Sequence, residues 1–205
     1  MSKIRTLNWP RYLSLLAGLG LAGITQAALI SRPGGLVYDS AQDLTWLMDA
    51  NYAGATMDWA GANAWAASLV YAGHDGWRLP TPDPDCPSLD GYDCTGAELG
   101  HLFYGDFALG LGGTAGTPIS TSHNANFDLF TNIADAGYWT NTALAEDQDY
   151  AWTFDYFDGS QLPYAKDVQF LAWAVHDGDL AVPEPATALL LAAGLAGWAG
   201  RRRRG

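Results

Sequence analysis

Gly76-Trp77-Arg78-Leu79-Pro80-Thr81 is the stretch of this chain that says most about its fold. Its glycine and proline mark the sharp start of a new element, and the large Trp77 side chain is expected in the core. Arg78 is expected to pair with an aspartate and hold two segments together; the alternative is contact with a carboxylate of a ligand. We therefore predict a structural motif made of Trp77, Arg78, Leu79 and Pro80.

Two strands and a helix are predicted ahead of this stretch. Residues 36–39 and 44–47 are short apolar runs on either side of a polar turn, a pattern typical of paired strands. Thr56 is expected as the N-cap of a helix over residues 57–70, in which apolar side chains recur at helical spacing. Gly73 is expected to mark the end of this helical region.

A second short helix and a set of strands are predicted after the stretch. Thr95 and Glu98 form a capping-box pattern, which predicts a helix beginning there. Residues 105–137 are rich in Gly, Thr and Asn and are expected to be a long ordered loop region. Alternating side chains predict antiparallel strands in the last third of the chain, at residues 138–142, 150–156 and 171–175. Because helices come early and antiparallel strands late, the predicted fold class is α+β.

The first 27 residues have the composition of a secretory signal peptide. Basic side chains within the first eleven positions precede an apolar run over residues 12–24, and small residues lead up to Ala27. We therefore expect residues 1–27 to form an N-terminal signal helix that is cleaved after Ala27 on export. The alternative is an uncleaved membrane anchor, which the shortness of the apolar run disfavours.

Residues 182–205 combine three signals. The prolines of Pro183-Glu184-Pro185 disfavour helix and sheet, so this segment is expected to be extended and open to a processing enzyme that cleaves there. An uncharged apolar run follows over residues 186–200 and is shorter than the ~20 residues that span a bilayer, so we expect a helix held only transiently in the inner membrane. Four arginines then stop transfer: Arg201, Arg202, Arg203 and Arg204. The alternative is a permanent C-terminal anchor.

The chain between these two ends is strongly acidic. Residues 28–185 contain three basic side chains, Arg32, Arg78 and Lys166, against all 22 acidic residues, which is a formal charge of −19. Such a field repels nucleic acid and anionic lipid headgroups. We therefore exclude nucleic acid as a partner, and we expect an anionic polysaccharide to approach only where divalent cations bridge the two.

The loop over residues 81–93 holds a cysteine and several carboxylates. In an exported chain, the close pair Cys86 and Cys94 is expected to form a disulfide; a metal-binding pair and reduced thiols are the alternatives. Dense oxygen ligands are what Ca²⁺ prefers, although their spacing does not match an EF-hand loop, so solvated loop charge is favoured over a Ca²⁺ site. The candidate ligands are Asp83, Asp85, Asp90 and Asp93.

Motifs of catalysis are missing from the sequence. It contains no Gly-x-Ser-x-Gly nucleophile motif, no His-Glu-x-x-His zinc motif and no phosphate-binding loop. A carboxylate pair of the kind that glycosidases use is expected by chance in a chain this rich in aspartate. We therefore assign no catalytic residue, expect no cofactor apart from the Ca²⁺ alternative, and predict that the protein is not an enzyme.

Several of these motifs occur in an order that resembles the Lcl C-terminal domain family, over about residues 36–178. They are Leu44-Thr45-Trp46-Leu47, the Gly76–Thr81 stretch, Glu98-Leu99, Tyr138-Trp139-Thr140 and Ala172-Trp173-Ala174-Val175. The resemblance implies a C-type-lectin-like α+β fold with two short helices and antiparallel strands, distantly similar to that of formylglycine-generating enzymes. The C-terminal tail is similar to a PEP-CTERM sorting signal, which implies an exosortase-type processing enzyme as partner.

These observations predict three segments and one principal function. The segments are a signal peptide over residues 1–27, an exported domain over 28–181 and a sorting signal over 182–205. We expect a non-enzymatic protein that reaches the cell envelope, the outer surface or the exopolysaccharide matrix after processing. The alternative is carbohydrate binding or adhesion, with or without cations, through the loop face around residues 81–135. A hydrolase or modifying enzyme of the formylglycine-generating-enzyme-like fold is the third reading.

Overall fold

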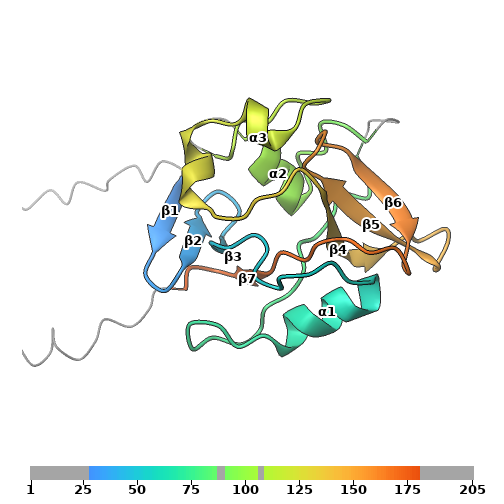
Figure 1. The fold of residues 1–205 in the computed structure, drawn as a ribbon, viewed down its shortest axis with the longest axis horizontal. Coiled ribbons are helices and arrows are strands. Elements are labelled where there is room, and N and C mark those ends of the chain that lie inside the picture. Colours follow the sequence, from blue (N-terminus) through green and yellow to red (C-terminus); the bar gives the residue numbers. More distant parts are fainter. Residues whose placement is uncertain (1–27, 87–90, 106–108, 181–205) are drawn as a thin grey trace, which may run out of the picture.

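The computed structural model describes residues 28–86, 91–105 and 109–180, and the statements below concern these ranges. Two antiparallel sheets form the centre of this part of the chain (Figure 1). The first has the strand order β1-β2-β3-β7 and the second the order β4-β5-β6. The predicted α+β class is therefore confirmed, whereas the finer C-type-lectin-like assignment stays a prediction.

The first sheet joins the beginning and the end of the described chain. Its strands are β1 (Leu29–Arg32), β2 (Leu36–Asp39), β3 (Leu44–Leu47) and β7 (Val175–Asp177). The two strands predicted at residues 36–39 and 44–47 are confirmed, with Val37 opposite Trp46 in the register. Of the strand predicted at residues 171–175, only Val175 lies in a strand, where it begins β7. The expected alternation is not observed before it, because Ala172, Trp173 and Ala174 are all buried.

The second sheet is a three-stranded meander. Its strands are β4 (Gly137–Ala143), β5 (Tyr150–Asp155) and β6 (Gln161–Ala165). The alternation expected along residues 150–156 is only partly observed, because Ala151 and Thr153 on the second face are buried as well. Both faces of this sheet are thus partly covered, which the sequence pattern alone did not predict.

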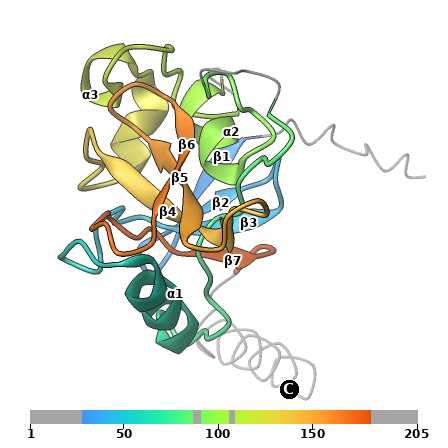
Figure 2. The same ribbon diagram turned by 90° about the vertical axis from the view of Figure 1, so that its right-hand side faces the viewer.

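Helices cover the sheets on two sides. Figures 1 and 2 show α1 (Trp59–Ser68) on one side, with α2 (Glu98–Tyr104) and α3 (Ile119–Ser122) on the other. A single 3₁₀ turn over Ala125–Leu129 follows α3, so the predicted loop region of residues 105–137 contains two short helical pieces. Among the described residues, no helix combines the length and apolarity needed to cross a membrane. The predicted terminal helices lie outside the described residues.

Both predicted helix starts are corrected by the structure. The N-cap of α1 is Asp58, not Thr56, because the Asp58 carboxylate accepts a hydrogen bond from the Gly61 N–H at 2.7 Å. The N-cap of α2 is Ala97 and makes no side-chain cap bond, so the capping box predicted from Thr95 and Glu98 is wrong. The physical reason is that the Glu98 carboxylate binds Arg78 instead.

An aromatic cluster fills the core between the two sheets. Trp173 lies at its centre, with ring centroids 5.1 Å from Trp46, 5.2 Å from Phe130 and 5.8 Å from Tyr138. The Trp173 indole N–H donates to the Leu47 carbonyl oxygen at 2.8 Å, so its one polar group is paired inside the core. The predicted burial of Trp77 is confirmed, at 2% exposure, and Trp173 is 0% exposed.

Candidate functional site

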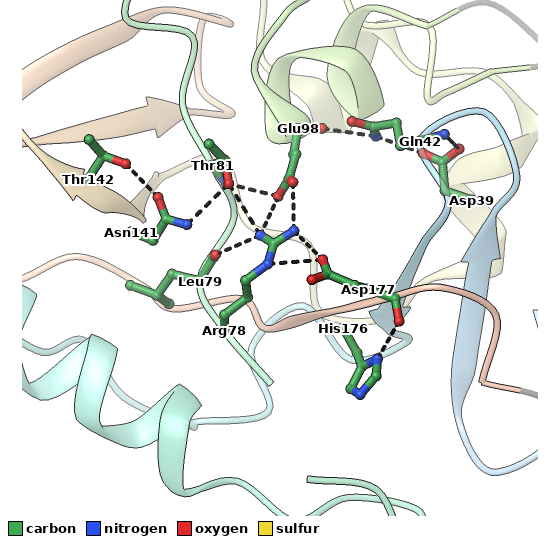
Figure 3. A network of polar contacts seen from close by, with 10 residues as sticks. All are labelled: Asp39, Gln42, Arg78, Leu79, Thr81, Glu98, Asn141, Thr142, His176 and Asp177. Atoms are coloured by element: carbon green, nitrogen blue, oxygen red, sulfur yellow. Dashed lines mark hydrogen bonds and ion pairs between the residues drawn. The ribbon is translucent and has the colours of Figure 1, made fainter. Parts of the chain in front are cut away.

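Arg78 is the centre of the polar network that Figure 3 shows. Its backbone exchanges two hydrogen bonds with Val175, each 2.9 Å, which places the side chain beside β7. The guanidinium meets the Glu98 carboxylate with two parallel hydrogen bonds of 2.8 Å. It also donates to one oxygen of Asp177, at 2.6 Å from Nη2 and 3.1 Å from Nε. We call Arg78, Glu98 and Asp177 the Arg78 clamp.

Every donor group of the Arg78 guanidinium has an acceptor within this cluster. Besides the two carboxylates, Nη1 reaches the Leu79 carbonyl oxygen at 3.1 Å and the Thr81 hydroxyl at 3.3 Å. Burial alone lowers the pKa of Arg78, but the hydrogen bonds to Glu98 and then Asp177 outweigh it and raise that pKa. The side chain is a permanent cation whose bonding capacity is used inside the fold, as the structural role predicts.

The clamp ties three parts of the chain together. The Thr81 N–H donates to Glu98 Oε2 at 2.8 Å, and the Glu98 N–H returns a bond to the Thr81 carbonyl oxygen at 3.0 Å. Asn141 of β4 adds a bond from its side chain to the Thr81 hydroxyl, 3.1 Å long. Leu79 and Pro80 are buried beside it. The predicted Trp-Arg-Leu-Pro motif thus fastens α2 and β7 to the second sheet.

The cysteine-containing loop is closed and docked on β6. Cys86 and Cys94 form the predicted disulfide. Gln161, the first residue of β6, holds the loop: its side chain accepts from the Asp83 N–H at 2.9 Å and donates to the Asp83 carbonyl oxygen at 2.6 Å. Its N–H also donates to the Gly91 carbonyl oxygen at 2.8 Å. Gly91 has φ +73°, and a Cβ there would collide with the Gln161 carbonyl oxygen, so the close approach requires glycine.

The loop aspartates do not converge within the described residues. The Asp83 carboxylate accepts the Asp85 N–H at 3.1 Å and lies against Gly96, so it is turned toward its own loop. Asp90 lies outside the described residues. Among the ranges that the structure describes, no group of three or more His, Cys, Asp or Glu side chains is placed to hold a metal ion. Binding of Ca²⁺ to Asp83, Asp85, Asp90 and Asp93 stays a prediction.

The end of the described chain is fastened to its beginning. Arg32 in β1 meets Asp179 with two hydrogen bonds of 2.9 and 2.6 Å, and this pair lowers the pKa of the Asp179 carboxyl. Thr45 accepts from the Leu180 N–H at 3.1 Å and donates to the Gly178 carbonyl oxygen at 2.7 Å. Leu180 is only 8% exposed. We call residues 178–180 the stem, and it ends three positions before Pro183.

The sorting residues predicted from the sequence follow the stem directly. They are Pro183, Glu184, Pro185, Arg201, Arg202, Arg203 and Arg204, and all of them lie outside the described residues. The signal peptide over residues 1–27 also lies outside the described residues.

A pocket of about 450 Å³ lies at the open end of the β5–β6 hairpin. Residues on both sides of the hairpin line it: Asp149, Tyr150, Ala165, Lys166 and Asp167. They meet because Tyr150 pairs with Ala165 and the Lys166 N–H donates to the Asp149 carbonyl oxygen at 2.9 Å. We call these five residues the hairpin pocket. This pocket was not predicted from the sequence, although acidic and aromatic residues occur close together at both strand ends, in Asp-Gln-Asp-Tyr and Tyr-Ala-Lys-Asp.

Comparison with known proteins assigns both parts of the chain. A search of curated proteins finds no match, and neither does a search of solved structures. The family model of the PEP-CTERM protein-sorting motif matches residues 181–204, and this motif marks an exported protein that an exosortase-type enzyme processes. The family model of the Lcl C-terminal domain matches residues 35–176, which include Arg78 and Glu98 of the clamp, the disulfide loop and the hairpin pocket. The chain belongs to the Lcl C-terminal domain family.

Proposed function

We propose that this protein is a non-enzymatic domain that is exported, released from the inner membrane by an exosortase-type enzyme and retained in the cell envelope or exopolysaccharide matrix. The observation that carries the proposal is the direct junction between the folded body of the chain, which the structure describes as far as Leu180, and the sorting motif. The stem is bonded into the first sheet as far as Leu180, and the matched motif begins at the next residue. The folded body is thus the cargo of the sorting signal, whose matched residues begin directly after the stem.

The bonding of the Arg78 clamp supports a role without catalysis. Catalytic groups need a free donor, acceptor or nucleophile facing a substrate. In this cluster the guanidinium donors are all paired, and Glu98 accepts from both Arg78 and Thr81. This polar network therefore serves to hold α2, β4 and β7 together.

The spacing of the stem and the apolar run supports transient membrane contact. Five residues lie between Leu180 and Ala186, so the chain can span at most ~21 Å between these two positions. A body of formal charge −19 is then held close to a membrane whose anionic headgroups repel it. Cleavage near Pro183-Glu184-Pro185 removes this constraint and frees the body.

Processing is tested by the intact mass and the location of the protein in its host. Wild-type protein is expected outside the inner membrane with a mass that lacks Arg201–Arg204. Glu184→Ala is expected to accumulate at full length in the membrane fraction, while Glu146→Ala, an exposed acidic control in the body, is processed normally. A mature wild-type protein that still contains the four arginines contradicts cleavage. Normal processing of Glu184→Ala contradicts recognition of that residue.

Carbohydrate binding is the second candidate function. The observation that favours it is the hairpin pocket, whose lining residues include an exposed tyrosine and two aspartates. This pocket lies at the end of β6 marked by Ala165, whereas the disulfide loop docks at Gln161, the other end. The loop face around residues 81–135 stays a prediction of its own, and the pocket is the better-defined place to look.

A further inference from the structure

We propose that the hairpin pocket binds a neutral sugar unit, with the Tyr150 ring as the stacking surface and Asp149 and Asp167 as acceptors for sugar hydroxyls. This inference rests on the second candidate function, carbohydrate binding, and names its site and ligand class.

Tyr150 supplies an accessible aromatic face. The side chain is 39% exposed although it stands at the first position of a strand, and the phenol group makes no hydrogen bond among the described residues. Aromatic rings in soluble proteins are mostly packed away, as the core of this domain illustrates. An exposed tyrosine among the residues that line a pocket offers an apolar platform with a polar tip.

The two carboxylates are free to accept hydrogen bonds. Within the described residues, neither Asp149 nor Asp167 has a side-chain hydrogen bond or an ion pair, although their backbone oxygens accept from Lys166 and Gln169. An ionised carboxylate accepts hydrogen bonds only, and O–H donors to it make short, strong bonds. A ligand rich in hydroxyl groups therefore matches this pair.

Lys166 does not turn the pocket into an anion site. Its ammonium group lies 4.4 Å from the centre of the Trp59 ring and donates to the Gln148 carbonyl oxygen at 2.5 Å. The cation is thus engaged by an aromatic face and a backbone acceptor. Two carboxylates against one engaged cation repel uronate or sulfate groups, so the fitting sugar is neutral.

The neighbouring surface extends the aromatic platform. Trp152 stands two positions after Tyr150 in β5 and therefore on the same face, roughly 7 Å along the strand. It is half-buried opposite Pro163, and within the described part of the chain its indole N–H has no acceptor. A second sugar unit next to the one on Tyr150 would meet this ring and its free donor. The site is thus suited to a short stretch of glycan.

Calorimetric titration of the full-length chain in a sugar-free zwitterionic detergent tests the site. The neutral probes are cellohexaose, maltohexaose and mannohexaose, and the anionic probe is hexameric mannuronate. We expect binding of at least one neutral hexamer and at least tenfold weaker binding by Tyr150→Ala. The matched control is Tyr164→Ala, because Tyr164 is equally exposed at 39% but lies on the opposite face of the hairpin. It is expected to change affinity less than twofold.

The double variant Asp149→Asn, Asp167→Asn tests the acceptors. It is expected to weaken neutral-sugar binding and to reduce the preference over mannuronate. Near-UV circular dichroism of each variant checks that the fold is kept. If neutral hexamers bind but Tyr150→Ala retains full affinity, the site is wrong while carbohydrate binding stands. If wild type binds none of the four hexamers at millimolar concentration, carbohydrate binding itself is overturned. Tighter binding of mannuronate than of any neutral hexamer overturns the ligand class.

Discussion

Replacing Arg78 with methionine is expected to lower the free energy of unfolding by about 2–3 kcal/mol. The substitution keeps much of the side-chain volume but removes the cation that meets both Glu98 and Asp177. Glu98 is then left at 17% side-chain exposure with the Thr81 N–H as its partner, so its charge loses compensation and is poorly hydrated. Asp177 is 76% exposed and regains water at little cost.

This magnitude follows from comparing two arginine pairs in the same body. Breaking a buried ion pair costs about 3–5 kcal/mol, whereas an exposed pair contributes about 0–1 kcal/mol. The Arg78 clamp is partly exposed and falls between these limits. Arg32 is the matched control, because its guanidinium also makes two bonds to one carboxylate, but Asp179 is 32% exposed and the pair joins fewer groups. We expect Arg32→Met to cost about 0.5–1 kcal/mol.

Urea unfolding followed by tryptophan fluorescence measures both variants at pH 7. A third variant, Arg78→Met with Glu98→Gln, separates the two sources of the cost. If the loss comes from the uncompensated Glu98 charge, neutralising Glu98 should restore about half of it. The reasoning is refuted if Arg78→Met loses no more stability than Arg32→Met, or if Glu98→Gln makes the double variant worse than Arg78→Met alone.

Two further predictions concern the disulfide. Thiol labelling of native protein should find no reactive group, and Cys86→Ser should cost up to about 3 kcal/mol by loosening the loop docked on Gln161; two labelled thiols in wild type contradict the pairing.

The parts of the fold that were predictable are those fixed by short-range pattern. The strands at residues 36–39 and 44–47 were predicted with their observed bounds, because apolar runs flank a polar turn. Burial of Trp77 followed from the size and apolar character of its side chain. Pairing of Arg78 followed from the scarcity of cations in an acidic body, although the sequence could not show that Glu98 as well as an aspartate takes part.

The errors arose where a distant partner decided a local choice. A capping box was the obvious use for Glu98, but Arg78, twenty positions earlier, takes its carboxylate. The hairpin pocket was hidden for a related reason. Asp149 and Asp167 look like ordinary solvated loop charge in the sequence, and only the pairing of Tyr150 with Ala165 brings them to one place. Long-range register, rather than residue type, creates that candidate site.

The three cations of the exported body link its architecture to the ligands it can accept. Arg32 holds the stem, Arg78 holds the clamp, and Lys166 lies over Trp59. Each is already engaged within the fold, so the described surface has no basic side chain left over to receive an anion. We therefore expect a partner that is neutral, carries positive charge, or brings its own cations. Of these three, the free carboxylates and open ring of the hairpin pocket favour the neutral one.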